Sequence, residues 1–132
     1  PQAWVYHKRR TDLKKFFKQV HNSGIARINL YKRHPKSLKI VHLLPTIFTL
    51  GVLLSIIGSV FFKWLIFVPL AYAFLIFIDA SIQHKNLKIG AIAVAASFVQ
   101  LIGYGTGFLR AFWSRIILKN PEFGAVEHNF YK

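Results

Sequence analysis

The sequence LLPTIFTLGVLLSIIGSVFF, from Leu43 to Phe62, is the first of three apolar runs that decide the fold. It holds no charged residue in 20 positions. The run Trp64–Ile78 (WLIFVPLAYAFLIFI) holds none in 15, and the run Ile89–Leu109 (IGAIAVAASFVQLIGYGTGFL) holds none in 21. About 20 helical residues cross the roughly 30 Å hydrocarbon core of a bilayer. The sequence therefore predicts three transmembrane helices, at about residues 41–62, 64–82 and 88–110.

Charge and apolar character occupy different parts of the chain. The 132 residues are 54% apolar, yet they include 18 Lys and Arg against 4 Asp and Glu. Eleven of the 18 basic residues precede Ile40, in front of the first apolar run. The chain has no cysteine, which excludes a disulfide framework and a thiolate metal site. This division is typical of a basic segment attached to a membrane-embedded region.

The basic segment, residues 1–40, carries a helical pattern. Thr11 or Asp12 is a plausible N-cap. The apolar residues that follow at helical spacing are Leu13, Phe16, Phe17 and Val20. Asn22-Ser23-Gly24 predicts a break or cap, and a second stripe comprises Ile25, Ile28 and Tyr31 before His34-Pro35 ends it. These stripes, flanked by lysine and arginine, predict basic amphipathic helices at the membrane interface.

We therefore expect an all-α membrane protein in which interfacial amphipathic helices precede three transmembrane helices. Its parts are a juxtamembrane segment (1–40), a three-helix region (41–113) and a polar tail (114–132), which we expect to be poorly ordered from Asn120 on. Pro45 suits the start of the first span, whereas Pro69 should kink the second. Ala3–His7 has the composition of a β-strand, and the chain opens without Met, so we expect a piece of a longer protein or a processed one.

The positive-inside rule places the basic N-terminal segment in the cytoplasm. Three full crossings then place Arg110, Arg115 and Lys119 on the opposite face, which goes mildly against that rule. The alternative is a third run that breaks at Gly103–Gly107 and does not cross. We expect three crossings, because the third run is long enough for one.

Few residues suggest chemistry of their own. Asp79 with His84 and Lys85 could take part in a proton or ion relay, but the place of Asp79 at the end of a run favours a solvated or ion-paired loop residue. Gln100 is a single amide that more often bonds a neighbouring helix than a ligand. The spacing of the six histidines matches no metal site, so we expect no metal in this chain. Gly103 and Gly107 match the G-x-x-x-G helix-packing pattern, although a hinge or helix end fits them equally well.

The basic run Lys8–Lys18 could bind nucleic acid. Next to three predicted spans, the simpler partner is a bilayer with anionic headgroups, or the phosphate of a ligand at its surface. We therefore expect lipid and no nucleic acid as the partner.

Several short motifs resemble the C-terminal membrane region of family 2 glycosyltransferases. Val5-x-His7-x-x-Arg10 resembles the strand that ends the catalytic domain of that family. The interfacial-helix pattern F-x-x-Q-x-x-x-x-G-x-x-R matches Phe16, Gln19, Gly24 and Arg27. His34-Pro35 and Leu44-Pro45 follow in the family's order. Tyr104-Gly105-Thr106-Gly107-Phe108-Leu109 resembles the Y-G-x-G-F segment of exopolysaccharide-type members, such as succinoglycan glucosyltransferases.

The resemblance implies an inverting enzyme that moves a sugar from a nucleotide-sugar to a lipid-linked or polysaccharide acceptor. It implies the bacterial inner membrane as the location, with a cytoplasmic N-terminal segment. The divalent metal, Mg or Mn, and the acidic catalytic motifs would belong to an upstream nucleotide-sugar-binding domain, so this chain should be inactive alone. By resemblance, the residues that contact substrate or acceptor are Gln19, Arg27, Arg10 and His7.

A different class of function stays open. The chain could be a small helical membrane protein in its own right, such as an oligomeric transporter or channel component that uses Asp79, Gln100 and the glycine segment. In either case three spans bury limited surface, so we expect dependence on another domain or homo-oligomers.

Overall fold

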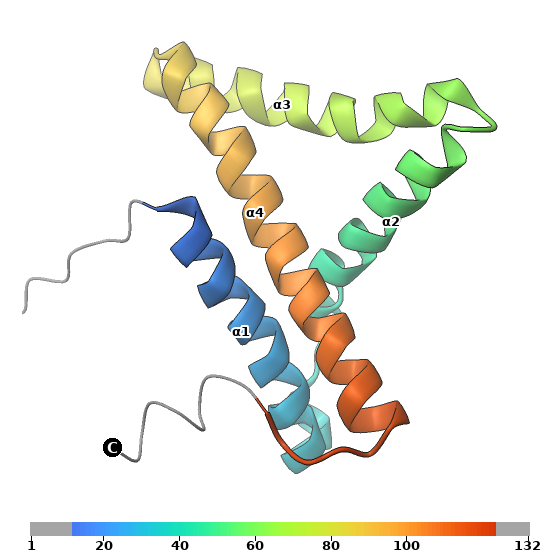
Figure 1. The fold of residues 1–132 in the computed structure, drawn as a ribbon. Coiled ribbons are helices and arrows are strands. Elements are labelled where there is room, and N and C mark those ends of the chain that lie inside the picture. Colours follow the sequence, from blue (N-terminus) through green and yellow to red (C-terminus); the bar gives the residue numbers. More distant parts are fainter. Residues whose placement is uncertain (1–11, 124–132) are drawn as a thin grey trace, which may run out of the picture.

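The computed structural model describes residues 12–123, and the regular secondary structure in this range is helical (Figure 1). The long helices are α1 (Leu13–Arg33), α2 (Leu44–Gly58), α3 (Phe67–His84) and α4 (Leu87–Phe112). The 3-10 turns are Pro35–Ser37, Ile40–His42 and Lys63–Ile66, and a π-helical turn covers Trp113–Ile117. Three segments are long and apolar enough to cross a membrane: Ile40–Gly58, Lys63–His84 and Leu87–Ile117. The predicted class, an all-α membrane protein, is confirmed for these residues.

Helix α1 is one continuous helix. The Asp12 carboxylate accepts a hydrogen bond from the Lys14 backbone N–H at 2.9 Å, which confirms Asp12 as the N-cap. The predicted break at Asn22-Ser23-Gly24 is wrong. Gly24 is buried against α4, where the absence of a side chain lets the two helix backbones approach, and this tertiary contact outweighs its low helix propensity.

Pro45 and Pro69 lie at helix starts, where the missing backbone N–H of a proline destabilises a helix little. Pro45 is in the first turn of α2, as predicted, and Pro69 is in the first turn of α3. The backbone N–H groups of a first turn have no acceptor within the helix, so a missing N–H is tolerated there. The predicted kink inside the second span is therefore replaced by the 3-10 turn Lys63–Ile66, which precedes α3.

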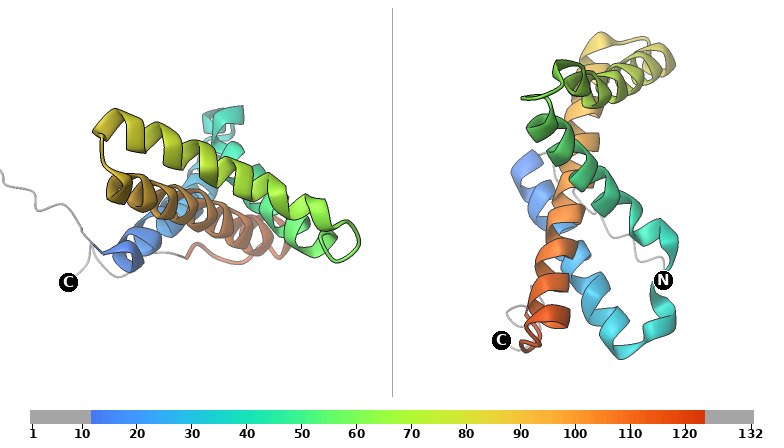
Figure 2. Two further views of the ribbon diagram at one scale, coloured as in Figure 1. Left: turned by 90° about the horizontal axis from the view of Figure 1, so that it is seen from above. Right: turned by 90° about the vertical axis from the view of Figure 1, so that its right-hand side faces the viewer.

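Helix α4 is the central element. It continues through Gly103–Gly107 without a break and passes directly into the π-helical turn. Figures 1 and 2 show α1 beside the C-terminal half of α4, and the two helices run in the same direction. Helices α2 and α3 form the other two sides of an open triangle with α4 (Figure 1).

Three aromatic rings join the sides of the triangle. The Phe48 ring on α2 lies 4.8 Å from that of Tyr72 on α3, between ring centroids, and 5.7 Å from that of Phe98 on α4. Tyr72 also shares a 2.7 Å hydrogen bond with Ser97 on α4. On α2, the Thr49 hydroxyl lies 3.1 Å from the Leu101 carbonyl oxygen of α4.

The buried apolar core is small and lies between α1 and α4. It consists of Ile25, Ile28, Phe108 and Ala111. Helix α3, by contrast, has no buried residue in the structure. Apolar side chains on α2 and α3 that would be unstable in water are suited to lipid, which agrees with the expected membrane protein.

The C-terminal part of the described chain folds back onto α1. Trp113–Ile117 is helical, and the backbone carbonyl of Phe123 accepts a hydrogen bond from Asn29 at 3.2 Å. Residues of the predicted tail, among them Arg115, Glu122 and Phe123, therefore contact α1. Arg115 contacts α1 directly, whereas three crossings would place it on the face opposite the basic segment. The strand expected at Ala3–His7 lies outside the described residues.

Candidate functional site

The contact between α1 and α4 is the best-defined interface of the described chain. A Cβ atom on Gly24 would overlap the Tyr104 carbonyl oxygen and come within 2.7 Å of the Phe108 nitrogen. A Cβ atom on Gly107 would overlap the backbone of His21. Glycine on each helix thus brings two backbones to a separation that no other residue permits at these positions.

Gly103 and Gly107, the two residues predicted to pack helices, both face α1. A Cβ atom on Gly103 would lie 2.6 Å from a methyl group of Val20 and 3.2 Å from the Phe17 ring. The two glycines are therefore part of a helix-packing surface, and α4 does not end or hinge at them.

Arg27 lies at the junction of α1, α4 and the turn before α2. Its guanidinium approaches the Tyr104 hydroxyl without reaching hydrogen-bond geometry, so this buried hydroxyl has no partner. The charges of Arg27 and Lys39 both act on His42. The Lys39 backbone N–H donates to His42 Nδ1 at 3.0 Å, which fixes that nitrogen as an acceptor. We call Arg27, Lys39, His42 and Tyr104 the junction cluster.

The junction cluster has the chemistry of an anion site. Arg27 is half-buried and Lys39 is exposed, so the two cations are accessible from the surface. A guanidinium offers several N–H donors in a fixed plane that matches phosphate oxygens. The unpartnered Tyr104 hydroxyl adds a donor, because a buried hydroxyl without a partner gains from any acceptor that reaches it.

A second polar group, His21, bridges the same two helices. Thr106 Oγ1 lies 2.7 Å from the Ile102 carbonyl oxygen, within its own helix, and 3.2 Å from His21 Nδ1. The Thr106 proton is directed to the carbonyl, so His21 Nδ1 is the donor. Burial, and then the Arg110 charge, lowers the pKa of His21 from its ordinary value, against the effect of the Gly103 carbonyl. The folded chain therefore favours neutral His21.

The buried Arg115 closes the far end of this interface. Its Nε donates to Asn29 Oδ1 at 3.0 Å, and its Nη1 donates to the Asn120 carbonyl at 3.0 Å. Arg33 on α1 forms an ion pair with Glu122 at 2.6 Å. The Arg115 guanidinium has hydrogen-bond partners in Asn29 and Asn120, so we assign Arg115 a structural role.

The structure separates the other predicted site residues. Gln19 is exposed and lies two turns before Arg27 on α1, so the two do not contact one common point. His7 and Arg10 lie outside the described residues. Asp79 is exposed and accepts hydrogen bonds from Gln83 on its own helix at 3.0 Å.

No relay or metal site forms among the residues that the structure describes. Gln100 is exposed in the middle of α4, and Arg110 lies near the C-terminal end of that helix. Asp79 lies near the C-terminal end of α3, beside the N-terminal end of α4. Within residues 12–123 there is no group of three histidine or acidic residues that could hold a metal ion. The glycine segment, Asp79 and Gln100 therefore do not form one site.

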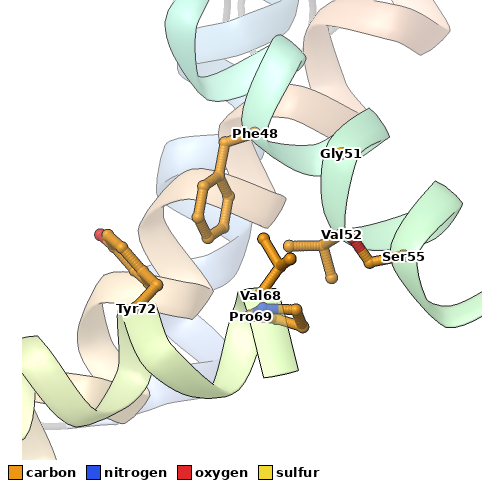
Figure 3. Close-up of a pocket in the computed structure, with 7 residues that line it drawn as sticks. All are labelled: Phe48, Gly51, Val52, Ser55, Val68, Pro69 and Tyr72. Carbon is orange, nitrogen blue, oxygen red and sulfur yellow. The ribbon is translucent and has the colours of Figure 1, made fainter. Parts of the chain in front are cut away.

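A groove opens between α2 and α3 (Figure 3). Its volume is about 300 Å³. The lining residues are Phe48, Gly51, Val52, Ser55, Val68, Pro69 and Tyr72. The wall is almost wholly apolar, so the groove suits a hydrocarbon chain better than a polar ligand.

Sequence reasoning missed the partners of the predicted residues. Nothing local connects Arg27 with Tyr104, or Asn29 with Arg115, because each pair joins helices that are far apart in the chain. The one available signal was the presence of glycine at Gly24 and Gly107, which we interpreted separately. A comparison with protein-family models, with curated proteins and with solved structures finds no match for this chain.

Proposed function

We propose that this chain is the membrane-anchoring and acceptor-presenting part of a glycosyltransferase. The enzyme would transfer a sugar from a nucleotide-sugar to a lipid-linked or polysaccharide acceptor. One observation carries the proposal: the two motifs that resemble this family lie against each other. Gly24 of the interfacial-helix motif packs against the backbone of Tyr104 and Phe108 in the Y-G-x-G-F segment.

The contact between the motifs gives the resemblance a physical meaning. The motif positions on α1 and α4 are separated by most of the chain, and neither pattern alone is specific. Their glycines nevertheless form one close interface, and Arg27 and Tyr104 meet at its edge. A shared interface explains why both patterns would occur in one protein.

The junction cluster supplies the proposed role. A lipid-linked acceptor carries phosphate at the membrane surface, and Arg27 and Lys39 can bind its oxygens there. The catalytic acids and the divalent metal would reside in a nucleotide-sugar-binding domain that docks on this surface. Within residues 12–123 the acidic residues are Asp12, Asp79 and Glu122, which lie on separate elements and form no metal-binding group.

The first experiment is to read the coding sequence in frame before Pro1. The proposal requires a nucleotide-sugar-binding α/β domain in that position. A start codon immediately before Pro1, with no such domain, would remove this proposal and favour the membrane protein that acts alone.

The second experiment measures sugar transfer by the full-length enzyme in membranes. Loss of a charged hydrogen bond costs about 1.5–3 kcal/mol, so Arg27→Ala should raise the acceptor KM by about 10- to 150-fold. Arg27→Lys should recover part of the loss, because it keeps the charge without the planar fork. Lys36→Ala, an exposed cation after α1, is the matched control and should leave KM unchanged. Equal KM values for Arg27→Ala and the control would exclude Arg27 from the site.

A further inference from the structure

The parallel packing of α1 and α4 constrains how the chain lies in the membrane, whatever its function. Phe17 and Val20 lie against Gly103, His21 lies against Gly107, and Asn29 lies against Arg115. The residue numbers rise together on both helices, so α1 accompanies the whole C-terminal half of α4.

These contacts place the C-terminal ends of α1 and α4 on one face of the membrane. The Lys32 ammonium donates to the Arg115 carbonyl at 3.2 Å, and Arg33 pairs with Glu122. Residues in direct contact cannot lie on opposite sides of a bilayer. The chain therefore crosses an even number of times between Arg33 and Arg115, and one of the three apolar helices does not cross.

The lysines of α1 identify α4 as that helix. Lys14, Lys15 and Lys18 are exposed and flank Phe17, which contacts Gly103. Because the helices are parallel, these lysines are level with the middle of the uncharged run of α4, Ile89–Leu109. A crossing by α4 would carry three ammonium groups toward the bilayer centre, where charged side chains are costly and rare.

Helices α2 and α3 have the features of the pair that crosses. They diverge from a short connection, where a Cβ on Gly58 would come within 2.7 Å of a Leu65 methyl group, and the Phe48 ring of α2 contacts the Tyr72 ring of α3. Their surfaces are apolar, and α3 has no buried residue. Of the three candidate spans, the one that contains α4 is the least apolar, and α4 contacts all three other long helices.

We infer that α4 does not cross the membrane: α1 and α4 together form one layer on the face that α2 enters, with the α1 lysines directed to anionic lipid headgroups. Within residues 12–123, all Lys and Arg residues except Lys63, at the α2–α3 turn, then lie on one face. This arrangement removes the exception to the positive-inside rule that three crossings create. Trp113, which is 62% exposed, lies at the level where aromatic side chains favour the interface.

Single-cysteine labelling tests the arrangement. The chain has no cysteine, so each variant carries one thiol. The variants are Ser23→Cys on α1, Phe62→Cys at the α2–α3 turn, His84→Cys at the end of α3, and Pro121→Cys after α4. All four sites are exposed. A membrane-impermeant maleimide is applied to sealed vesicles of known orientation, with lysed vesicles as the control for total labelling.

We expect Ser23→Cys, His84→Cys and Pro121→Cys to label from the same side, and Phe62→Cys from the other. Labelling of Pro121→Cys from the side opposite to His84→Cys would show that α4 crosses, and would overturn the inference. Labelling of His84→Cys with Phe62→Cys, against the other two, would show that α3 is the helix that does not cross, which also overturns it.

Hydrogen exchange tests the lipid partner. In nanodiscs that contain phosphatidylglycerol, the α1 amides should exchange at least several-fold more slowly than in nanodiscs of phosphatidylcholine alone. The triple variant Lys14→Gln, Lys15→Gln, Lys18→Gln should abolish that difference, whereas Lys63→Gln should preserve it. Equal exchange of the unmodified chain in both lipids would exclude anionic headgroups as the partner of α1.

Discussion

Arg115 Nε donates a 3.0 Å hydrogen bond to Asn29 Oδ1, and this contact joins the C-terminal ends of α4 and α1. Arg115 is only 8% exposed, so its charge depends on such partners. Asn29→Ala should destabilise the docking of α1 by about 1.5–3 kcal/mol, the cost of a lost hydrogen bond to a buried charge. Hydrogen exchange of α1 in detergent measures this change. Asn22→Ala, two turns earlier on α1, is the control and should shift exchange far less.

Gly24 and Gly51 offer a matched pair of helical glycines. A methyl group at Gly24 would collide with the α4 backbone, whereas nothing lies within 4 Å of the Cβ position at Gly51. Gly24→Ala should therefore separate α1 from α4 and lower the thermal stability. Gly51→Ala should raise stability by about 0.5–1 kcal/mol, because alanine is the better helix former. Thermal unfolding in detergent measures both changes, and a stabilising Gly24→Ala would contradict the close packing.

The protonation of His21 should make the α1–α4 contact sensitive to pH. Burial and the Arg110 charge hold the pKa of His21 below its ordinary value of about 6.5. As pH falls below about 6.5, the unfolded chain binds the proton first, so stability is complete above that pH and decreases below it. Unfolding measured between pH 7.5 and 5 should show this loss. His21→Gln should remove much of it, while His34→Gln, at an exposed site, should not.

Tyr72 separates the effect of a hydrogen bond from that of packing. Tyr72→Phe removes the 2.7 Å bond to Ser97 but keeps the ring, and should cost about 0.6 kcal/mol, the average for such bonds in membrane proteins. Tyr72→Ala also removes the ring from contact with Phe48 and Phe98, and should cost several times more. Equal losses in unfolding free energy would show that the aromatic contacts contribute little.

The sequence predicted the helices well because their signals are local. Uncharged runs and the Asp12 cap depend on neighbouring residues, and the fold class followed from them. Gly24 was misinterpreted because low helix propensity is a local property, while its contact with Tyr104 is tertiary. The contact of Arg115 with α1 is also tertiary, so no local signal predicts it. Counting spans assigns each apolar run a crossing, but only the fold shows that Arg115 contacts α1.

The candidate site was predicted only in part. Arg27 was predicted through the resemblance. The turn before α2 places Lys39 and His42 near Arg27, and the packing of α4 on α1 places Tyr104 there. No periodicity connects these positions, since they belong to three elements. A prediction from the sequence would have required the recognition that Gly24 and Gly107 are one interface.

Both proposals depend on the contact of α1 with Gly103 and Gly107 of α4. Disulfide formation in the double variant Val20→Cys, Gly103→Cys tests it most directly, since a Cβ on Gly103 would lie 2.6 Å from a Val20 methyl group. Mild oxidation in membranes should cross-link this pair, and Val20→Cys with Gly51→Cys, the control on α2, should stay reduced. Efficient cross-linking of the control, or none in Val20→Cys, Gly103→Cys, would contradict the packing of α1 on α4.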